Sequence, residues 1–122
     1  MDRLRGRVAE TLGYALTKLM KDQIGRGPED MRVYLVDDII LVRLLKVLTP
    51  AEMHVATASE GSDMVKEFRK TLLKTWKSDL EGPVDQALGA HVIRVYADLD
   101  TTDDEMMIVI VLDRKIVPPA GG

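Results

Sequence analysis

The chain opens with apolar side chains spaced three and four residues apart, which is the spacing of one face of a helix. This pattern predicts a helix over residues 2–24, with an apolar face made of Leu4, Val8, Leu12, Ala15, Leu16, Leu19, Met20 and Ile24. The segment Gly25-Arg26-Gly27-Pro28 follows, with a glycine that accepts a left-handed conformation and a proline that cannot continue a helix. We therefore expect the chain to change direction there.

Residues 31–36 and 39–47 are rich in β-branched and large apolar side chains, which is typical of strands. Between them, Asp37-Asp38 tolerates the positive φ of a tight turn, so the two runs are predicted to form a hairpin. The next segment has a capping hydroxyl at Thr49, a proline in the first turn and a glutamate three residues after the threonine. These signals predict a short helix that ends near Thr57.

A longer helix is predicted beyond it, capped by Ser59 or Ser62. Its apolar stripe consists of Val65, Phe68, Leu72, Trp76 and Leu80. The basic side chains fall largely on its other faces: Lys66, Arg69, Lys70, Lys74 and Lys77. Gly82-Pro83 is expected to kink or interrupt this helix before a last turn that ends at Gly89.

The period of the pattern changes to two near residue 93, which indicates strands. In the first of these strands the predicted buried face consists of Ile93, Val95, Ala97 and Leu99. Residues 106–112 are apolar at every position, so this second strand either has both faces covered or pairs in the centre of the sheet.

The predicted order is helix, strand, strand, helix, helix, strand, strand, with both strand pairs joined locally. This order favours an α+β fold in which helices pack on a four-stranded, mainly antiparallel sheet made of two hairpins. The chain has 122 residues, the common size of one domain. We predict a single α+β domain over residues 1–117 and a flexible C-terminal tail over residues 118–122.

The composition of the chain argues against several classes of protein. Apolar residues make up 46% of the chain and charged residues 30%, which indicates a globular rather than a disordered chain. The net charge of −3 argues against a DNA-binding protein, because duplex DNA normally requires a cationic surface. The chain has no cysteine, which suits the cytosol, and no apolar run near the ~20 residues that a spanning helix needs. We expect a cytoplasmic protein that does not itself span a membrane.

Five carboxylates cluster near the predicted tip of the second hairpin: Asp98, Asp100, Asp103, Asp104 and Glu105. Oxygen ligands at this density can hold Ca²⁺ or Mg²⁺. However, Thr102 and Asp103 stand where the calcium-loop pattern requires an acidic or amide residue and a glycine. A solvated hairpin tip explains the cluster better, and we predict no metal site.

No catalytic or cofactor-binding motif is recognisable in the chain. The two histidines, His54 and His91, belong to different predicted elements, and the Asp37-Asp38 pair is explained by its turn. No Walker, dinucleotide or GxSxG pattern is present. We therefore expect a protein without enzymatic activity and without a cofactor.

The all-apolar strand and the amphipathic first helix give this small chain a surplus of apolar surface. The surplus predicts a homodimer with a twofold axis, and the dense core of a monomer is the alternative. Arg3, Arg5 and Arg7 and the lysine-rich face of the long helix are explained by ordinary solvated surface. Contact with phosphate, an acidic partner or a lipid head group is the alternative.

Several motifs together resemble one known family. They are Gly25-Arg26-Gly27-Pro28, Val36-Asp37-Asp38, Leu48-Thr49-Pro50-Ala51-Glu52, Glu60-Gly61, Val65, Arg69, Leu88-Gly89 and a strand ending in Asp98. With these motifs the chain resembles, over residues 3–115, the MpsC-like family, a bacterial domain named for a Na⁺-translocating, membrane-potential-generating system. It departs from the family pattern at Gly82-Pro83 and in its long acidic hairpin tip.

The resemblance implies a small soluble protein encoded beside an antiporter-like membrane subunit and a large zinc protein linked to inorganic-carbon uptake. We accordingly expect a non-enzymatic accessory or regulatory protein of a membrane ion or bicarbonate transport system, acting through contacts with a transport subunit. A small-anion or nucleotide sensor is the alternative, with Arg26, Gly27, Pro28 and Arg69 as the candidate binding residues. An RNA-binding module is a third alternative, suggested only by the order of helices and hairpins.

Overall fold

The fold follows the predicted order of elements in the computed structural model, which describes residues 2–117. The helices are α1 (Asp2–Gln23), α2 (Pro50–Ala56), α3 (Gly61–Lys74) and α4 (Lys77–Leu88). The strands are β1 (Asp30–Val36), β2 (Ile39–Leu45), β3 (Val92–Asp100) and β4 (Glu105–Leu112). All neighbouring strands are antiparallel, in the order β1-β2-β4-β3. The α+β class and the two-hairpin sheet are confirmed, and the predicted tail, 118–122, lies outside the described residues.

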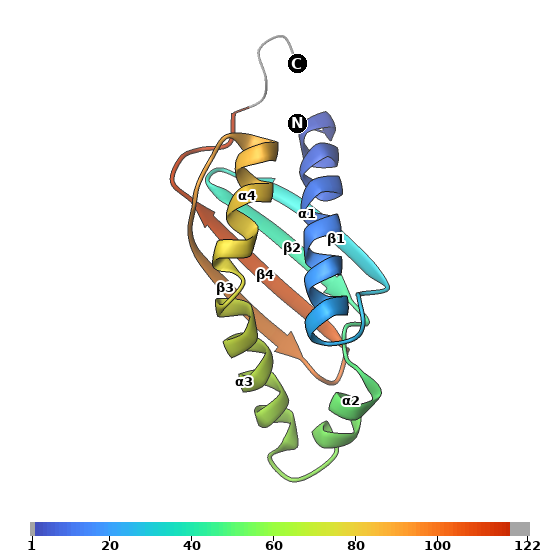
Figure 1. Cartoon of the computed structure of the whole chain (residues 1–122). Coiled ribbons are helices and arrows are strands. Elements are labelled where there is room, and N and C mark those ends of the chain that lie inside the picture. Colours follow the sequence, from blue (N-terminus) through green and yellow to red (C-terminus); the bar gives the residue numbers. More distant parts are fainter. Residues whose placement is uncertain (1, 118–122) are drawn as a thin grey trace.

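The helices α1 and α4 lie side by side over one face of the sheet, while α3 and α2 extend past one end of it (Figure 1). The core forms between this helix layer and the sheet, from side chains such as Leu12, Leu16, Val84, Ile40 and Ile108, all fully buried. Burying each such side chain contributes roughly 1.5–3 kcal/mol. None of the helices described here has the length and apolarity that a membrane span requires.

The strand β4 is central in the sheet, between β2 and β3. A central position was one of the two arrangements predicted from its apolar sequence. Its exposure alternates: Met106, Ile108, Ile110 and Leu112 are buried beneath the helices. Met107, Val109 and Val111 are only partly buried, because they belong to the opposite face of the sheet. The described helices leave that face uncovered, and we call it the open face.

The first hairpin has the predicted turn, and Asp37 adopts the expected positive φ of 56°. The predicted end of its second strand at residue 47 is wrong, because β2 ends at Leu45. Lys46 takes a left-handed conformation, with φ of 60°, and its N–H donates to the carbonyl of Asp104 at 2.8 Å. This kink turns the chain away from the sheet and towards α2.

The predicted long helix is two helices, and its break lies at residues 75–76 rather than at Gly82-Pro83. Trp76 is buried at the break, and its indole Nε1 donates to Gln23 Oε1 at 2.7 Å, at the end of α1. Pro83 lies inside α4. Packing of Leu80 and Val84 on either side of Pro83 keeps the helix continuous, so tertiary contact overrides the local preference.

The predicted stripe and cap of this helix are also partly wrong. Phe68 is 55% exposed, and Arg69 is buried in its place. The N-cap is Glu60, in a left-handed conformation and without a side-chain cap, rather than Ser59 or Ser62. The rotation of α3 is set by the polar contacts of Arg69, which outweigh burial of an aromatic ring.

In the second hairpin, β3 departs from the predicted alternation at its start. A register shift between Val92 and Arg94 leaves Ile93 41% exposed and turns Val92 into the core. Beyond this bulge, Val95, Ala97 and Leu99 face the helices as expected. A single extra residue reverses the facing of every side chain before it, because the strand period is two.

Gly61, at the start of α3, provides a test of how closely α2 and α3 pack. A Cβ at this position would lie 1.7 Å from the carbonyl oxygen of Val55, so no side chain fits without moving the backbone. We expect Gly61→Ala to lower the free energy of unfolding by about 1–3 kcal/mol or more, measured by urea denaturation.

The matched control is Gly6→Ala in α1, where an added Cβ meets nothing within 4 Å. That change should raise stability by roughly 0.5–1 kcal/mol, because alanine favours helix interiors over glycine. Equal effects of the two substitutions would contradict the close contact at Gly61.

Candidate functional site

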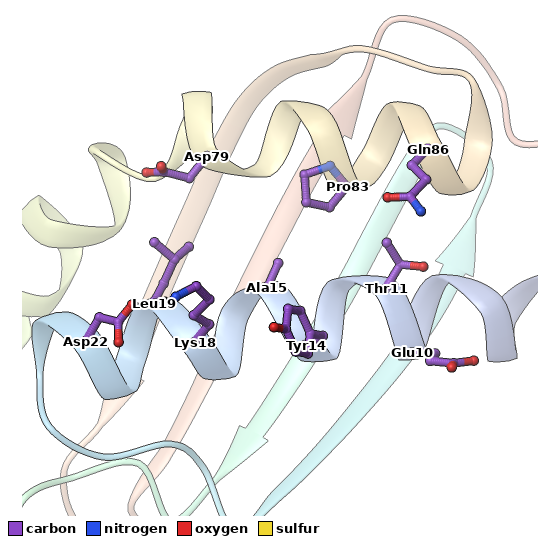
Figure 2. Close-up of a pocket in the computed structure, with 10 residues that line it drawn as sticks. All are labelled: Glu10, Thr11, Tyr14, Ala15, Lys18, Leu19, Asp22, Asp79, Pro83 and Gln86. Carbon is purple, nitrogen blue, oxygen red and sulfur yellow. Dashed lines mark hydrogen bonds and ion pairs between the residues drawn. The ribbon is translucent and has the colours of Figure 1, made fainter.

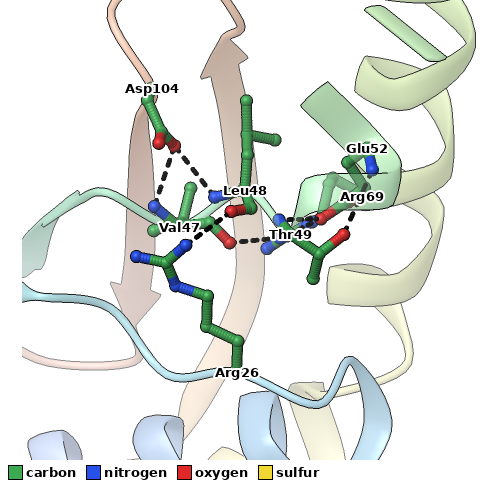
Figure 3. Close-up of polar contacts among 7 residues, drawn as sticks. All are labelled: Arg26, Val47, Leu48, Thr49, Glu52, Arg69 and Asp104. Atoms are coloured by element: carbon green, nitrogen blue, oxygen red, sulfur yellow. Dashed lines mark hydrogen bonds and ion pairs between the residues drawn. The ribbon is translucent and has the colours of Figure 1, made fainter. Parts of the chain in front are cut away.

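The two arginines predicted from the sequence meet at the connection between β2 and α2 (Figure 3). Arg69 donates from Nη2 to the carbonyl oxygen of Val47 at 2.6 Å. Arg26 donates from Nη1 to the carbonyl oxygen of Leu48 at 2.9 Å. The sequence left open whether these arginines share a site, and the structure places their guanidinium groups on adjacent carbonyls.

Asp104, at the tip of the second hairpin, holds the same two residues by their amides. The N–H groups of Val47 and Leu48 both donate to Asp104 Oδ1, at 2.8 Å each. Because the side chains of Val47 and Leu48 are buried, their backbone groups need partners within the protein. Asp104, Arg26 and Arg69 supply those partners, so this network fixes the connection in one conformation.

Arg69 and Glu52 form a forked ion pair beneath this connection. Nε of Arg69 donates to Glu52 Oε2 at 2.6 Å, and Nη2 donates to Glu52 Oε1 at 2.7 Å. The side chain of Arg69 is 0% exposed and that of Glu52 is 12% exposed. Two parallel charge-assisted bonds of this kind are stronger than a single neutral bond and fix orientation as well. Arg69 Nη1 is buried without a hydrogen-bond partner among residues 2–117.

Glu52 is held in place by the start of its own helix. Thr49 and Glu52 form the predicted capping box, in which Thr49 N–H donates to Glu52 Oε1 at 2.9 Å and Glu52 N–H donates to Thr49 Oγ1 at 3.1 Å. Burial acts to raise the pKa of Glu52, but hydrogen bonds from Arg69 and Thr49 lower it below its ordinary value. The carboxylate is therefore held in its charged form.

The four candidate anion-binding residues occupy different environments. Arg69 is enclosed, and Glu52 supplies its counter-charge. The side chain of Arg26 is 31% exposed and lies 3.4 Å from Glu29. Gly27 packs against Thr17 of α1, and Pro28 lines a shallow surface hollow nearby. An anion arriving from solvent would meet Arg26 rather than Arg69, and binding at this place stays a prediction.

The acidic cluster of the second hairpin engages protein groups. Among residues 2–117, no group of three or more His, Asp or Glu side chains is arranged to hold a metal ion. Asp100 Oδ1 instead accepts the N–H groups of Thr102 and Asp103, at 2.9 and 3.1 Å. The remaining pairs of the cluster are Asp98 with Lys70 and Glu105 with Arg43. Turn formation and ion pairing therefore account for these carboxylates.

A groove of about 820 Å³ lies between α1 and α4 and is open to solvent (Figure 2). Tyr14 stands at its edge and is 75% exposed. The lining carries three acidic side chains against one basic one, and that Lys18 is already paired with Asp22 at 3.2 Å. The lining consists of Glu10, Thr11, Tyr14, Ala15, Lys18, Leu19, Asp22, Asp79, Pro83 and Gln86.

Sequence reasoning missed this groove, because it exists only where two helices distant in the chain lie together. The available signal was Tyr14, an aromatic residue outside the apolar face of the first helix. A groove lined by the partly buried apolar side chains of Ala15 and Leu19 and by exposed acidic side chains can receive an amphipathic segment of another protein.

The ion pair of Arg69 provides a test of the network. We expect Glu52→Leu to destabilise the fold by about 3–5 kcal/mol in urea denaturation, because it leaves the Arg69 charge buried and unpaired. The double variant Glu52→Leu/Arg69→Met should be more stable than Glu52→Leu alone, since no charge is then buried. A double variant that is less stable than Glu52→Leu would contradict this account, and Glu67→Leu on the exposed face of α3 is the control.

The lowered pKa of Glu52 also predicts a pH dependence. A carboxylate whose pKa is lower in the folded than in the unfolded state stabilises the fold fully above its ordinary pKa of 4.5. That stabilisation is lost as the pH falls below this value and through the folded-state pKa. Wild type should therefore lose stability more steeply than Glu52→Gln when unfolding is measured from neutral pH to acid. If the stability of the two proteins fell equally with pH, Glu52 would not contribute to the pH dependence of stability.

The comparisons with known proteins give one family and two relatives. The family model described as "Na+-translocating membrane potential-generating system (MpsC)" matches residues 4–114. The chain is similar to the uncharacterized protein YbcI of Bacillus subtilis (strain 168), with 28% identity covering 92% of this chain and 90% of the relative. It is also similar to the uncharacterized protein YrhF of the same organism, with 29% identity covering 83% of this chain and 84% of the relative. No solved structure matches. Since the family model covers nearly all of it, the chain belongs to the MpsC family.

Proposed function

We propose that this protein is a non-enzymatic accessory or regulatory protein of a membrane ion-transport system. In this proposal it acts in the cytoplasm, as a homodimer, by binding a membrane subunit of that system. Membership of a family named for Na⁺ translocation and membrane-potential generation is the observation that carries the proposal. A narrower version, in which the system moves inorganic carbon, rests only on the resemblance described for the sequence.

The groove between α1 and α4 is the surface that we assign to the membrane subunit. Its three acidic side chains, Glu10, Asp22 and Asp79, make it a surface for a basic segment. Cytoplasmic loops of membrane proteins carry an excess of lysine and arginine near the ends of their spans. Opposite charge on the two surfaces would speed encounter and select the partner.

Apolar contact would supply the affinity that charge alone does not. Tyr14 presents an exposed ring beside the partly buried Ala15 and Leu19. Tyrosine is enriched among residues that dominate binding energy, because its ring buries a large area at low entropic cost. An amphipathic helix from a cytoplasmic loop, basic on one face and apolar on the other, fits both features.

The proposal is tested by crosslinking inside cells of the organism that encodes the protein. A photo-reactive amino acid at position 14 should give an adduct with a polytopic membrane protein, identified by mass spectrometry. Asp79→Lys and Glu10→Lys should each reduce that adduct, because each removes the net negative charge of the groove. Glu67→Lys, the same charge change on the exposed face of α3, is the matched control and should leave the adduct unchanged.

A second readout separates the role from the contact. Cells that carry only the Asp79→Lys protein should show a lowered membrane potential, whereas cells with Glu67→Lys should not. Adducts that contain only soluble proteins, together with a normal membrane potential in the deletion strain, would overturn the proposal.

A further inference from the structure

We propose that the open face of the sheet is the interface of the homodimer, on which the same face of a second copy of this chain packs. This inference deepens the homodimer of the proposed function by naming its surface. The helices α1 and α4, which line the groove, lie on the other side of the sheet, so both partners can bind at once (Figure 1).

The residues of the open face follow from the strand register. Alternate positions of the four strands point away from the helices, and the pairing sets them in rows across the sheet. The first two rows are mainly apolar: Val36, Ile39, Val111 and Arg94, then Tyr34, Leu41, Val109 and Tyr96. The third row is Arg32, Arg43, Met107 and Asp98.

The upper half of this face is unusually apolar for a surface in contact with water. Val36 is 58% exposed, Tyr96 55% and Tyr34 38%. Antiparallel sheets that face solvent normally alternate apolar and polar residues, but β2 and β4 carry apolar side chains on both faces. Contiguous apolar surface of this kind marks an interaction site.

A second copy is the occupant that the charge pattern favours. The third row is basic on β1 and acidic on β3, through Arg32 and Asp98. We consider two copies whose open faces meet, related by a twofold axis that runs parallel to the strands and between the two sheets. In this arrangement β1 of one copy lies over β3 of the other, and each row faces the same row of the other copy. Arg32 then faces Asp98 of the partner subunit, so the row is complementary to its own copy.

The same operation superposes the apolar rows. Leu41 faces Val109 of the partner subunit, and Tyr34 faces Tyr96 of the partner subunit. The strands of two packed sheets cross at about −30°, so the corners of one sheet do not lie directly over the corners of the other. The acidic corners at Asp30 and Asp100 therefore stay in solvent. A twofold axis across the strands, with the faces in full overlap, would instead lay the apolar rows over the charged ones.

The existing partners of the two charged residues do not prevent this pairing. Arg32 lies 3.2 Å from Asp30, and Asp98 lies 3.6 Å from Lys70. All four side chains are at least 40% exposed, and exposed pairs of this kind contribute little. Arg32 and Asp98 can therefore exchange or share partners when two copies meet.

The size of the face sets the expected strength. Four strands about 4.8 Å apart and seven residues long at about 3.4 Å each outline roughly 19 by 24 Å. Side-chain relief enlarges the accessible area beyond this outline, but it stays near or below the ~800 Å² that each partner contributes to a standard interface. We therefore expect a dimer that dissociates in the micromolar range.

Sedimentation equilibrium of the full chain, from low micromolar to submillimolar concentration, tests the proposal. Wild type should dimerise, and Arg32→Asp and Asp98→Arg should each weaken dimerisation roughly tenfold or more, because each places like charges opposite one another. The double variant Arg32→Asp/Asp98→Arg should restore the dimer. Leu41→Lys should abolish it, and Lys77→Asp at the start of α4 is the control. Circular dichroism checks that each variant is folded.

Two outcomes would overturn the inference. One is a wild type that stays monomeric over the whole concentration range. A monomer whose open face is covered by another protein in cell extracts would equally overturn it. The other is a dimer unaffected by Leu41→Lys or not rescued by the double charge reversal. The groove variant Asp79→Lys should leave the dimer intact, so loss of the membrane partner and loss of the dimer are separate results.

Discussion

A buried positive charge constrains this fold more than any other single feature. Arg69 lies entirely out of water, so it requires a carboxylate and backbone acceptors in fixed positions. Glu52 provides the carboxylate only when α2 begins at its capping box, and Val47 provides the carbonyl only when β2 ends at Leu45 and the chain kinks at Lys46. The end of the sheet, the start of α2 and the rotation of α3 are therefore fixed together.

This constraint shapes the surface as well as the core. Turning Arg69 inwards leaves Phe68 on the outside of α3, and the chain then bends at Trp76 so that α4 lies against α1. The acidic groove lies between α1 and α4, so it depends on this placement of α4. The helices of residues 2–117 also cover one face of the sheet and leave the other open. The protein thus presents two different surfaces on opposite sides, one acidic and grooved and one flat and apolar.

Part of the candidate site was predictable from the sequence through the family resemblance. Arg26 and Arg69 stood out because they match motif positions of that family and no simple structural role explained them. Their convergence on Val47 and Leu48 was not predictable, because it depends on three elements meeting at one connection. The role of Asp104 was hidden for the same reason, since a carboxylate at a hairpin tip gives no sign of which amides it will accept.

The sequence by itself determined the features that depend on neighbouring residues. The helical and strand periods, the Asp37 turn, the capping box at Thr49 and the order of elements all arise from local geometry and short-range hydrogen bonds. Tertiary structure decided the features that depend on distant residues: the end of β2 at Leu45 with the kink at Lys46, the bulge at Ile93, the break at Trp76 and the burial of Arg69 over Phe68. At each of these places the local preference is small, and a buried contact with another element outweighs it.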